Sequence, residues 1–265
     1  MGKRLENKVA IITGGASGIG EETARLFAEH GARGVVIADI QEQKGQKVAE
    51  SIGSQRCIFI KCDVSDEEQV KSLVESTIKI YGQLDIMFSN AGIASAGKQD
   101  ILDLDLNACE KLFSINVHGT IACVKHAGRV MVENGTKGSI ICTTSVVAGV
   151  GAPPALIDYV MSKHAVLGLV RCASKGLGQY GIRVNSVAPG PVATPLTCDA
   201  FGKSTEEIEK YFEPDFILKG KENLKANHIA NAVLFLASDD SVSVTGHNLS
   251  VDGGYVPFIK WLPRN

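Results

Sequence analysis

The chain has 265 residues, of which 45% are hydrophobic and 21% are charged, and its formal net charge at pH 7 is -2. This length favours one domain with a sizeable core, and this composition is typical of a folded globular protein rather than a disordered chain. The small net charge gives no electrostatic argument for a nucleic acid or an anionic membrane as partner, and we expect neither.

Seven cysteines are scattered along the chain without the paired spacing of a metal site or a disulfide framework. We therefore predict no metal and a reducing compartment. The first eight residues are polar and lead into only a short apolar run, which is typical of neither a signal peptide nor a membrane span. On these grounds we expect a cytoplasmic protein.

Short β-branched runs alternate with longer amphipathic stretches along the chain. The predicted strands cover residues 9–13, 34–38, 57–61, 84–89, 138–143 and 183–187. The predicted helices include residues 21–30, 42–52, 66–81 and 155–179. This alternation predicts the α/β class, as a Rossmann-type doubly wound parallel sheet with helices on both faces. We expect a single domain over residues 1–265.

Residues 192–223 interrupt this alternation with Pro195, Pro214 and a mixture of aromatic and charged side chains. We interpret the segment as an excursion from the sheet rather than a second domain. Loops of this kind often carry the specificity of an enzyme.

A glycine-rich stretch follows the first predicted strand directly and runs into a predicted helix. Glycines allow a tight turn and let the backbone approach a pyrophosphate, whose charge meets the N–H groups at the helix start. Because the strand and the helix are both in place, the stretch predicts a dinucleotide-binding loop rather than a bare turn. The candidate cofactor residues are Gly14, Ser17, Gly18, Ile19 and Gly20.

Two acidic residues follow later strands. Asp39 ends the second predicted strand, 19 positions after Gly20. A carboxylate there accepts hydrogen bonds from the adenosine ribose and repels a 2′-phosphate, which favours NAD over NADP; an ordinary surface Asp at a strand end is the alternative. Asp63, which precedes Val64, either meets the adenine or caps the helix that begins near Asp66.

Tyr159 and Lys163 lie four residues apart in a predicted helix, so their side chains share one face. Tyrosine titrates near pH 10, and a neighbouring cation together with a positive nicotinamide ring would lower its pKa. Such a phenol can take the proton of an alcohol while a hydride leaves for the cofactor. Taken alone, however, a Tyr–Lys pair is more often surface packing than chemistry.

The ordered set of motifs resembles the short-chain dehydrogenase/reductase family over residues 13 to 254. The matching positions are the glycine loop, Asn90-Ala91-Gly92, Asn116, Ser145, Tyr159, Lys163, Pro189-Gly190 and Val192-Ala193-Thr194. This resemblance implies that Ser145 holds the substrate oxygen and that Tyr159 is the acid/base. It implies that Lys163 binds the nicotinamide ribose and lowers the pKa of Tyr159, and that Asn116 anchors a water in a proton relay.

The same resemblance implies that Asn90, Ala91, Gly92, Pro189, Val192 and Thr194 contact the cofactor, with Thr194 and the Val192 backbone fixing the carboxamide. For two of these residues a purely structural role is the alternative, since Asn116 could bond the helix backbone and Ser145 could cap a strand end. Family members are commonly tetramers, which implies a symmetric homotetramer. The apolar tail at residues 254–262 agrees with burial against another subunit.

Two departures from the family pattern are visible. Ser89 stands where the family usually has an Asn before Asn90-Ala91-Gly92, and the spacing from Ser145 to Tyr159 is 14, one longer than the commonest value. The loop before Tyr159 must absorb the extra residue. Thr143 and Thr144 offer substitute hydroxyls, but strand alternation favours Ser145.

Apolar side chains dominate the segments expected around the substrate, at residues 93–97, 146–156 and 194–216. This suits a small lipophilic alcohol, ketone or lactol, although the same residues would also suit a core or a subunit interface. Within the family the chain resembles the plant secondary-metabolism branch with isopiperitenol, borneol and secoisolariciresinol dehydrogenases and nepetalactol-related enzymes. That resemblance implies a monoterpenoid or iridoid substrate.

Three functions compete. The first is NAD-dependent oxidoreduction, which the complete tetrad and Asp39 favour. The second is a non-redox cyclase or isomerase, because the resembling branch includes proteins that keep NAD bound and cyclise a reactive enol. The third is an idle NAD-binding scaffold, which the unbroken tetrad disfavours.

Overall fold

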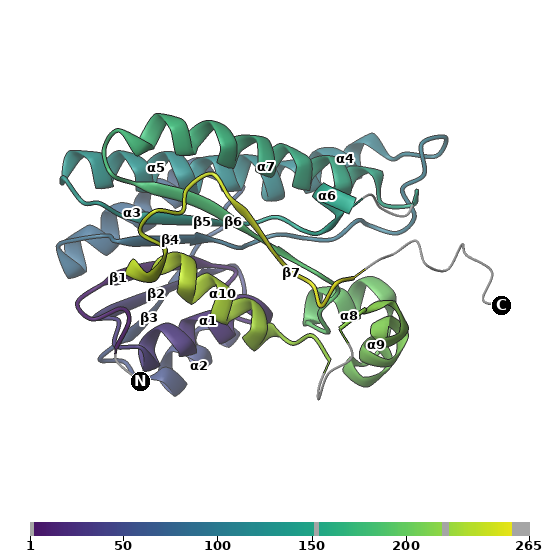
Figure 1. Ribbon diagram of the computed structural model, residues 1–265, viewed down its shortest axis with the longest axis horizontal. Helices are drawn as coiled ribbons and strands as arrows, with labels where there is room; N and C mark the ends of the chain where they lie inside the picture. Colours follow the sequence, from purple (N-terminus) through teal and green to yellow (C-terminus); the bar gives the residue numbers. More distant parts are fainter. Residues whose placement is uncertain (1–2, 151–153, 219–222, 256–265) are drawn as a thin grey trace.

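The computed structural model describes residues 3–150, 154–218 and 223–255. Its centre is a seven-stranded sheet in the order β3-β2-β1-β4-β5-β6-β7, in which every pairing is parallel (Figure 1). The strands are β1 Val9–Thr13, β2 Gly34–Asp39, β3 Cys57–Lys61, β4 Ile86–Ser89, β5 Ser139–Thr143, β6 Arg183–Pro189 and β7 Asn248–Val251. The chain order reverses between β1 and β4, which is where doubly wound sheets place their ligands.

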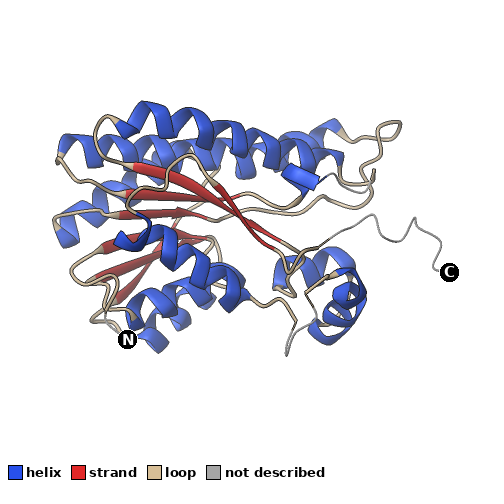
Figure 2. Cartoon of the chain, in the orientation of Figure 1, coloured by secondary structure: helices blue, strands red, loops and turns tan. Residues whose placement is uncertain are grey.

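Helices cover both faces of this sheet, and Figure 2 shows the strands enclosed between the two layers. One layer contains α1 Gly18–Glu29, α2 Glu42–Ile52 and α10 Ala226–Ala237 (Figure 1). The other contains α3 Glu67–Tyr81, α4 Leu106–Phe113, α5 Thr120–Glu133, the short α6 Val147–Val150 and α7 Ile157–Gly178, with a π-helical turn at Ser114–Gly119 between α4 and α5. Each layer packs its own apolar cluster against the sheet. The predicted fold class is confirmed.

The sheet follows from its sequence because nearly every residue of β1 and β2 is apolar and buried on both faces, as parallel sheets require. The six predicted strands are all present, and their starts lie within two residues of the predicted ones. The seventh strand, β7, escaped prediction. Its side chains are only partly buried, and Asn248 and Ser250 break the apolar run that would have marked it.

Segment 192–223 leaves the sheet after β6 and contains α8 Pro195–Phe201 and α9 Thr205–Phe212. Both helices lie beside the carboxyl end of β7 (Figure 1). Ile208, Phe212 and Phe216 are buried in a small cluster of their own, to which Tyr255 adds a ring 5.9 Å from that of Phe216. This cluster holds the segment together and shares Leu224 with the main core.

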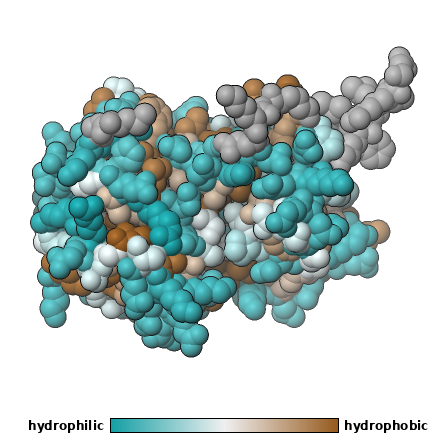
Figure 3. All heavy atoms as spheres, turned by 90° about the horizontal axis from the view of Figure 1, so that it is seen from below, coloured by the Kyte–Doolittle hydropathy of each residue, from teal (hydrophilic) through white to brown (hydrophobic). Residues whose placement is uncertain are grey.

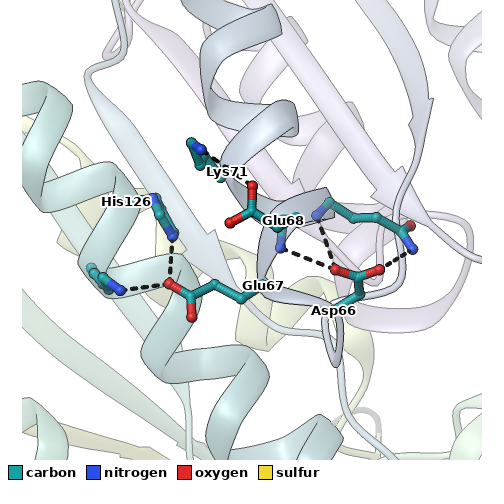
Figure 4. Close-up of polar contacts among 7 residues, drawn as sticks. Asp66, Glu67, Glu68, Lys71 and His126 are labelled. Carbon is teal, nitrogen blue, oxygen red and sulfur yellow. Dashed lines mark hydrogen bonds and ion pairs between the residues drawn. The ribbon is translucent and has the colours of Figure 1, made fainter.

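The layer of α3 and α5 is joined by an ion-pair cluster at its surface (Figure 4). The Asp66 carboxylate caps α3 by accepting the backbone N–H groups of Glu68 and Gln69. The neighbouring Glu67 carboxylate binds Lys125 Nζ at 2.5 Å and His126 Nε2 at 3.0 Å, both from α5. These contacts lower the pKa of Glu67. The cluster joins the start of α3 to α5, the helix that follows the π-helical turn.

The surface seen from below Figure 1 is mainly hydrophilic, with apolar colour confined to small areas (Figure 3). Among the helices that the structure describes, none combines the length and the apolar composition that a bilayer span demands.

Candidate active site

The candidate residues gather at the carboxyl edge of the sheet because parallel strands all end there. The glycine loop follows β1, Asp39 ends β2, Asn90 follows β4, Ser145 follows β5 and Pro189 ends β6. Tyr159 and Lys163 reach this edge from α7, and Asn116 reaches it from the π-helical turn.

The glycine loop has no room for side chains. Gly14 adopts a φ of +66°, and a Cβ there would lie 2.9 Å from the Ala91 Cα. A Cβ on Gly20 would lie 2.1 Å from the Gly14 carbonyl oxygen. A Cβ on Gly18, whose φ is +57°, would lie 3.3 Å from the Thr194 Cβ. The loop is thus packed between the segment after β4 and the segment after β6.

This loop places the start of α1 at the carboxyl edge of the sheet. The Ser17 side chain does not cap the helix, so the first N–H groups of α1 are available to an anion. Ile19 lies in this first turn and packs against the core. Uncapped N–H groups at the start of a helix, next to a glycine loop, fit the pyrophosphate of a dinucleotide.

Asp39 is almost fully buried at the end of β2. Its Oδ2 accepts the Ala16 N–H at 3.1 Å, and its Oδ1 accepts the Gln41 N–H at 2.9 Å. A carboxylate has about four acceptor positions, so the group retains acceptor capacity for a ribose diol. The surface-Asp alternative does not describe this side chain, which is tied into the glycine loop itself.

Asp63 and Val64 follow β3. The Asp63 Oδ1 accepts both the backbone N–H and the hydroxyl of Ser65, at 2.9 and 2.7 Å, so the carboxylate closes a local turn. The helix cap that sequence offered as its alternative role belongs to Asp66. Val64 is buried against Gly119. An adenine contact of these two residues stays a prediction.

Thr13 and Asn90 join the ends of three strands. The backbone N–H groups of Asn90 and Ala91 donate to the Thr13 hydroxyl at 3.0 and 3.1 Å, and the Asn90 Nδ2 donates to the Thr13 carbonyl at 3.1 Å. The Thr143 hydroxyl donates to the Asn90 Oδ1 at 3.0 Å. Asn90 therefore joins the ends of β1, β4 and β5 by backbone and side-chain hydrogen bonds. Thr13 is its supporting partner, which sequence reasoning did not single out.

Ser145 is the hydroxyl that lies beside Tyr159. It is near enough to the phenol to lower its pKa. The competing hydroxyls are engaged elsewhere, because Thr143 donates to Asn90 and Thr144 bonds the Val187 carbonyl and the Asn248 side chain. The Ser145 loop is tied to β6 by the hydrogen bond from the Val146 N–H to the Pro189 carbonyl.

Lys163 lies one helical turn after Tyr159 on the same face of α7. Its ammonium is 5.5 Å from the centre of the Tyr159 ring and donates to the Thr143 carbonyl at 2.9 Å. A Cβ on Gly92 would lie 3.7 Å from this nitrogen, which places the Asn90–Gly92 segment directly beside it. The side chain is buried.

Burial governs the pKa values of this pair. Desolvation raises the pKa of Tyr159 to about 12, and the neighbouring Ser145 hydroxyl offsets only part of the increase. Desolvation lowers the pKa of Lys163 to about 8. Burial thus acts against the phenolate in the chain by itself, and the lowering of the Tyr159 pKa by Lys163 together with a bound nicotinamide ring stays a prediction.

Asn116 is buried in the π-helical turn. Its Oδ1 accepts the Ile93 N–H at 2.8 Å, and its Nδ2 donates to the Ile93 carbonyl at 3.0 Å and to the Ser162 hydroxyl at 3.3 Å. The side chain thus holds the loop after β4 rather than the helix backbone. π-helical turns often mark functional sites, and a relay water at Asn116 stays a prediction.

Thr194 and Val192 are both buried where the chain leaves β6, and the Thr194 N–H donates to the Val192 carbonyl at 2.8 Å. Of the apolar residues expected around the substrate, Phe212 and Phe216 are buried in the cluster of the excursion. Leu196, Phe201 and Tyr211 are partly exposed, and the rings of Phe201 and Tyr211 contact one another and that of Phe212. Most of the apolar tail, residues 256–262, lies outside the described residues.

Within residues 3–150, 154–218 and 223–255, no cluster of three or more His, Cys, Asp or Glu side chains has the arrangement of a metal site. The polar groups at the sheet edge are instead the hydroxyl, phenol, ammonium and amide of the tetrad. Such a set can hold a carbonyl or alcohol oxygen and move its proton.

Gly20→Ala tests the glycine cradle. We expect cofactor affinity to fall by more than about tenfold, because a Cβ 2.1 Å from the Gly14 carbonyl must displace the loop. Calorimetric titration with NAD measures the loss. Gly168→Ala is the matched control, since Gly168 is exposed in α7 with nothing within 4 Å of its would-be Cβ. Equal NAD affinity in both variants would contradict the assignment.

Comparison with known proteins shows extensive similarity. A family described as enoyl-(acyl carrier protein) reductase matches residues 14–256. The chain is 55% identical to (-)-isopiperitenol/(-)-carveol dehydrogenase, mitochondrial, from Mentha piperita, over 97% of both chains. It is 54% identical to a (+)-cis,cis-nepetalactol synthase from Nepeta racemosa, over 98% of this chain and 96% of that protein.

Among solved structures, a short-chain type dehydrogenase/reductase from Mycobacterium marinum superposes with a TM-score of 0.87 and 32% identity, over 96% of this chain and 98% of that one.

The expectation of a cytoplasmic location is wrong on this comparison, since the Mentha piperita relative is named mitochondrial. Free cysteines are compatible with any reducing compartment. They therefore could not single out the cytoplasm.

Proposed function

The chain belongs to the short-chain dehydrogenase/reductase family, and we propose that it oxidises a lipophilic secondary alcohol or lactol of the monoterpenoid or iridoid class with NAD. A nicotinamide dinucleotide follows from the family and its fold. The observation that carries the proposal is that Ser145, Tyr159 and Lys163 gather at the carboxyl edge of the sheet, with the Lys163 ammonium 5.5 Å from the centre of the Tyr159 ring.

Each member of the site has a defined task. Ser145 holds the substrate oxygen beside the phenol, so that the hydroxyl proton of the substrate can pass directly to Tyr159. Tyr159 takes the hydroxyl proton as the carbonyl forms. Lys163, fixed by the Thr143 carbonyl, holds a positive charge next to the phenol and would bind the nicotinamide ribose. NAD bound at this edge would supply the hydride acceptor and a positive charge near Tyr159, which would oppose the effect of burial on its pKa.

The preference for NAD rests on Asp39. Its carboxylate is fixed by two backbone N–H groups at the place that the adenosine ribose occupies in doubly wound folds. A second negative charge from a 2′-phosphate would be repelled there.

Asp39→Ala is expected to weaken NAD binding by about 10- to 100-fold, the value of one or two hydrogen bonds to a charged group. NADP binding should change much less, so the ratio of the two affinities narrows. Titration with both cofactors measures this. An unchanged preference would remove Asp39 from the cofactor site, and Asp103→Asn, an exposed loop position, serves as control.

The substrate class rests on the relatives, one named for isopiperitenol and carveol and others for nepetalactol. The exposed apolar side chains on α8 and α9 agree with a lipophilic ligand. The nepetalactol synthases also support a second candidate, in which the same site closes a ring without net oxidation and NAD stays bound.

One experiment separates the two candidates. Purified protein is mixed with NAD and a panel of cyclic monoterpenoid alcohols and lactols, and NADH absorbance and chiral products are measured in the same samples. NADH together with the matching ketone or lactone supports the dehydrogenase. Bound NAD without NADH, and a cyclised product from a reactive dialdehyde or enol, supports the cyclase.

We also propose a symmetric homotetramer. Large exposed side chains at Leu106 of α4 and Ile121 of α5 support an interface on that side of the molecule. Light scattering should give the mass of four 28.1 kDa chains. A mass of one or two chains would contradict the proposal.

A further inference from the structure

A buried carboxylate lies directly beside the acid/base residue. Asp158 is in the first turn of α7, has no solvent exposure, and precedes Tyr159. Among the described residues, its Oδ2 is the one buried side-chain nitrogen or oxygen atom without a hydrogen-bond partner. Leaving an acceptor of this kind unpaired costs stability, so stability alone does not explain the residue.

The other oxygen makes two contacts. The Asp158 Oδ1 accepts the Ser95 hydroxyl at 2.5 Å and the backbone N–H of Tyr159 at 2.7 Å. Leu156, the residue before α7, provides no side-chain cap. Asp158 therefore satisfies one N–H at the helix start and places a negative group where the helix dipole favours it.

Ser95 belongs to the loop that runs from β4 to α4. This loop also meets the start of α7 at Gln99, whose N–H donates to the Ala155 carbonyl at 2.9 Å and whose carbonyl accepts the Ile157 N–H at 3.4 Å. Asn116 holds the other end of the loop at Ile93. The Ser95–Asp158 hydrogen bond is thus the contact that joins the middle of the loop to the turn carrying Tyr159.

We propose that Asp158 is a positioning residue, which fixes Tyr159 in the first turn of α7 and couples it to the substrate-side loop through Ser95. This inference rests on the proposed function, in which Tyr159 is the acid/base and residues 93–97 face the substrate. Displacement of a reacting group by about 1 Å can reduce a rate by about 100-fold, so one such contact is sufficient to affect catalysis.

The test compares Ser95→Ala, Asp158→Leu, Asp158→Asn and the double variant Ser95→Ala/Asp158→Leu. We expect the first two to lower kcat/KM by about tenfold or more, with NAD affinity unchanged. Asp158→Asn keeps an oxygen that accepts both hydrogen bonds, so it should retain most of the activity. The kcat/KM of the double variant should be no lower than that of the less active single variant, because both changes remove the same contact.

The substrate is whichever of (-)-carveol and nepetalactol the unmodified protein oxidises. If it oxidises neither, amide hydrogen exchange gives the readout, and Ser95→Ala should reduce the protection of residues 93–97 and of the Tyr159 N–H. Ser51→Ala is the control, since its hydroxyl bonds only the Val48 carbonyl within α2. Ser95 is half-buried on a loop, so its variant tests the contact even if Asp158→Leu fails to fold.

Tyr159→Phe is measured in parallel. If it is inactive while the Ser95 and Asp158 variants differ from the unmodified protein only in Tm, with kcat, KM and amide protection unchanged, the positioning role is overturned and the proposed function stands. If Tyr159→Phe is itself active, the acid/base assignment fails and the positioning role fails with it. Loss of activity in Asp158→Asn equal to that in Asp158→Leu would also contradict the hydrogen-bond argument.

Discussion

Tyr159→Phe is expected to lower kcat/KM for the alcohol by about 100- to 10,000-fold, the range that general acid–base catalysis contributes. The substitution removes the hydroxyl beside Ser145 and leaves the ring 5.5 Å from the Lys163 ammonium. Because the packing is kept, the variant should fold and should still bind NAD. Steady-state NADH formation and calorimetric NAD titration measure the two properties separately.

Tyr180→Phe is the matched control for this prediction. Tyr180 is half-exposed beyond the end of α7, far along the helix from the sheet edge, so the loss of its hydroxyl should leave both properties unchanged. Retention of most activity in Tyr159→Phe would show that another group moves the proton. Loss of NAD binding in the same variant would show instead that the phenol is primarily a cofactor contact.

Lys163→Met should abolish activity and at the same time stabilise the fold. The buried ammonium has a pKa of about 8 in the folded chain, against an ordinary value of 10.5. Below pH 8 it is charged in both the folded and the unfolded chain, so the full cost of burying that charge is present. A difference of this size corresponds to about 3 kcal/mol, from which the lost hydrogen bond to Thr143 subtracts about 1 kcal/mol.

The pH dependence gives this prediction a distinct signature. Between pH 8 and 10.5 the unfolded chain binds a proton that the folded chain lacks, so the stability of the unmodified protein should rise with pH in that window. Lys163→Met should remove this contribution, and its advantage should shrink from pH 7 to pH 9.5. Urea unfolding of the cofactor-free protein at the two values measures the effect.

Lys175→Met serves as control because Lys175 is exposed on the same helix. If Lys163→Met is less stable than the unmodified protein at pH 7, the hydrogen bond of Lys163 outweighs the cost of burying its charge. If the variant is active, Lys163 is not required for catalysis. The expected combination, more stable and inactive, is the pattern of a residue kept for function.

Several features of the site could be predicted because they depend on residues close in sequence. The glycine loop is recognisable from a strand, a glycine pattern and a helix, all within residues 9–29. The spacing of Tyr159 and Lys163 alone places them on one face of a helix. The sequence also favoured Ser145 over its two threonine neighbours, and the structure agrees, because Thr143 bonds Asn90 and Thr144 bonds Asn248.

Other features depended on contacts between distant parts of the chain. Thr13 and Asn90 are 77 positions apart, and Ser95 and Asp158 are 63 apart, so no local pattern marks either pair. The rise of the Tyr159 pKa in the chain by itself could not be predicted, because its cause is burial by surrounding elements. β7 was missed because its strand character comes from pairing with β6.

The sequence by itself therefore determined the α/β class and the glycine loop between its strand and its helix, since hydrophobic periodicity and short spacings encode both, while the tetrad was identified by its resemblance to the family. Only the tertiary structure decided that Thr143 and Thr144 bind other partners, that Asp63 closes a local turn, and that Asp158 joins the helix of Tyr159 to the loop beside it. The physical reason is that hydrogen-bond partners and desolvation are set by what packs around a side chain, and that depends on segments far away in the chain.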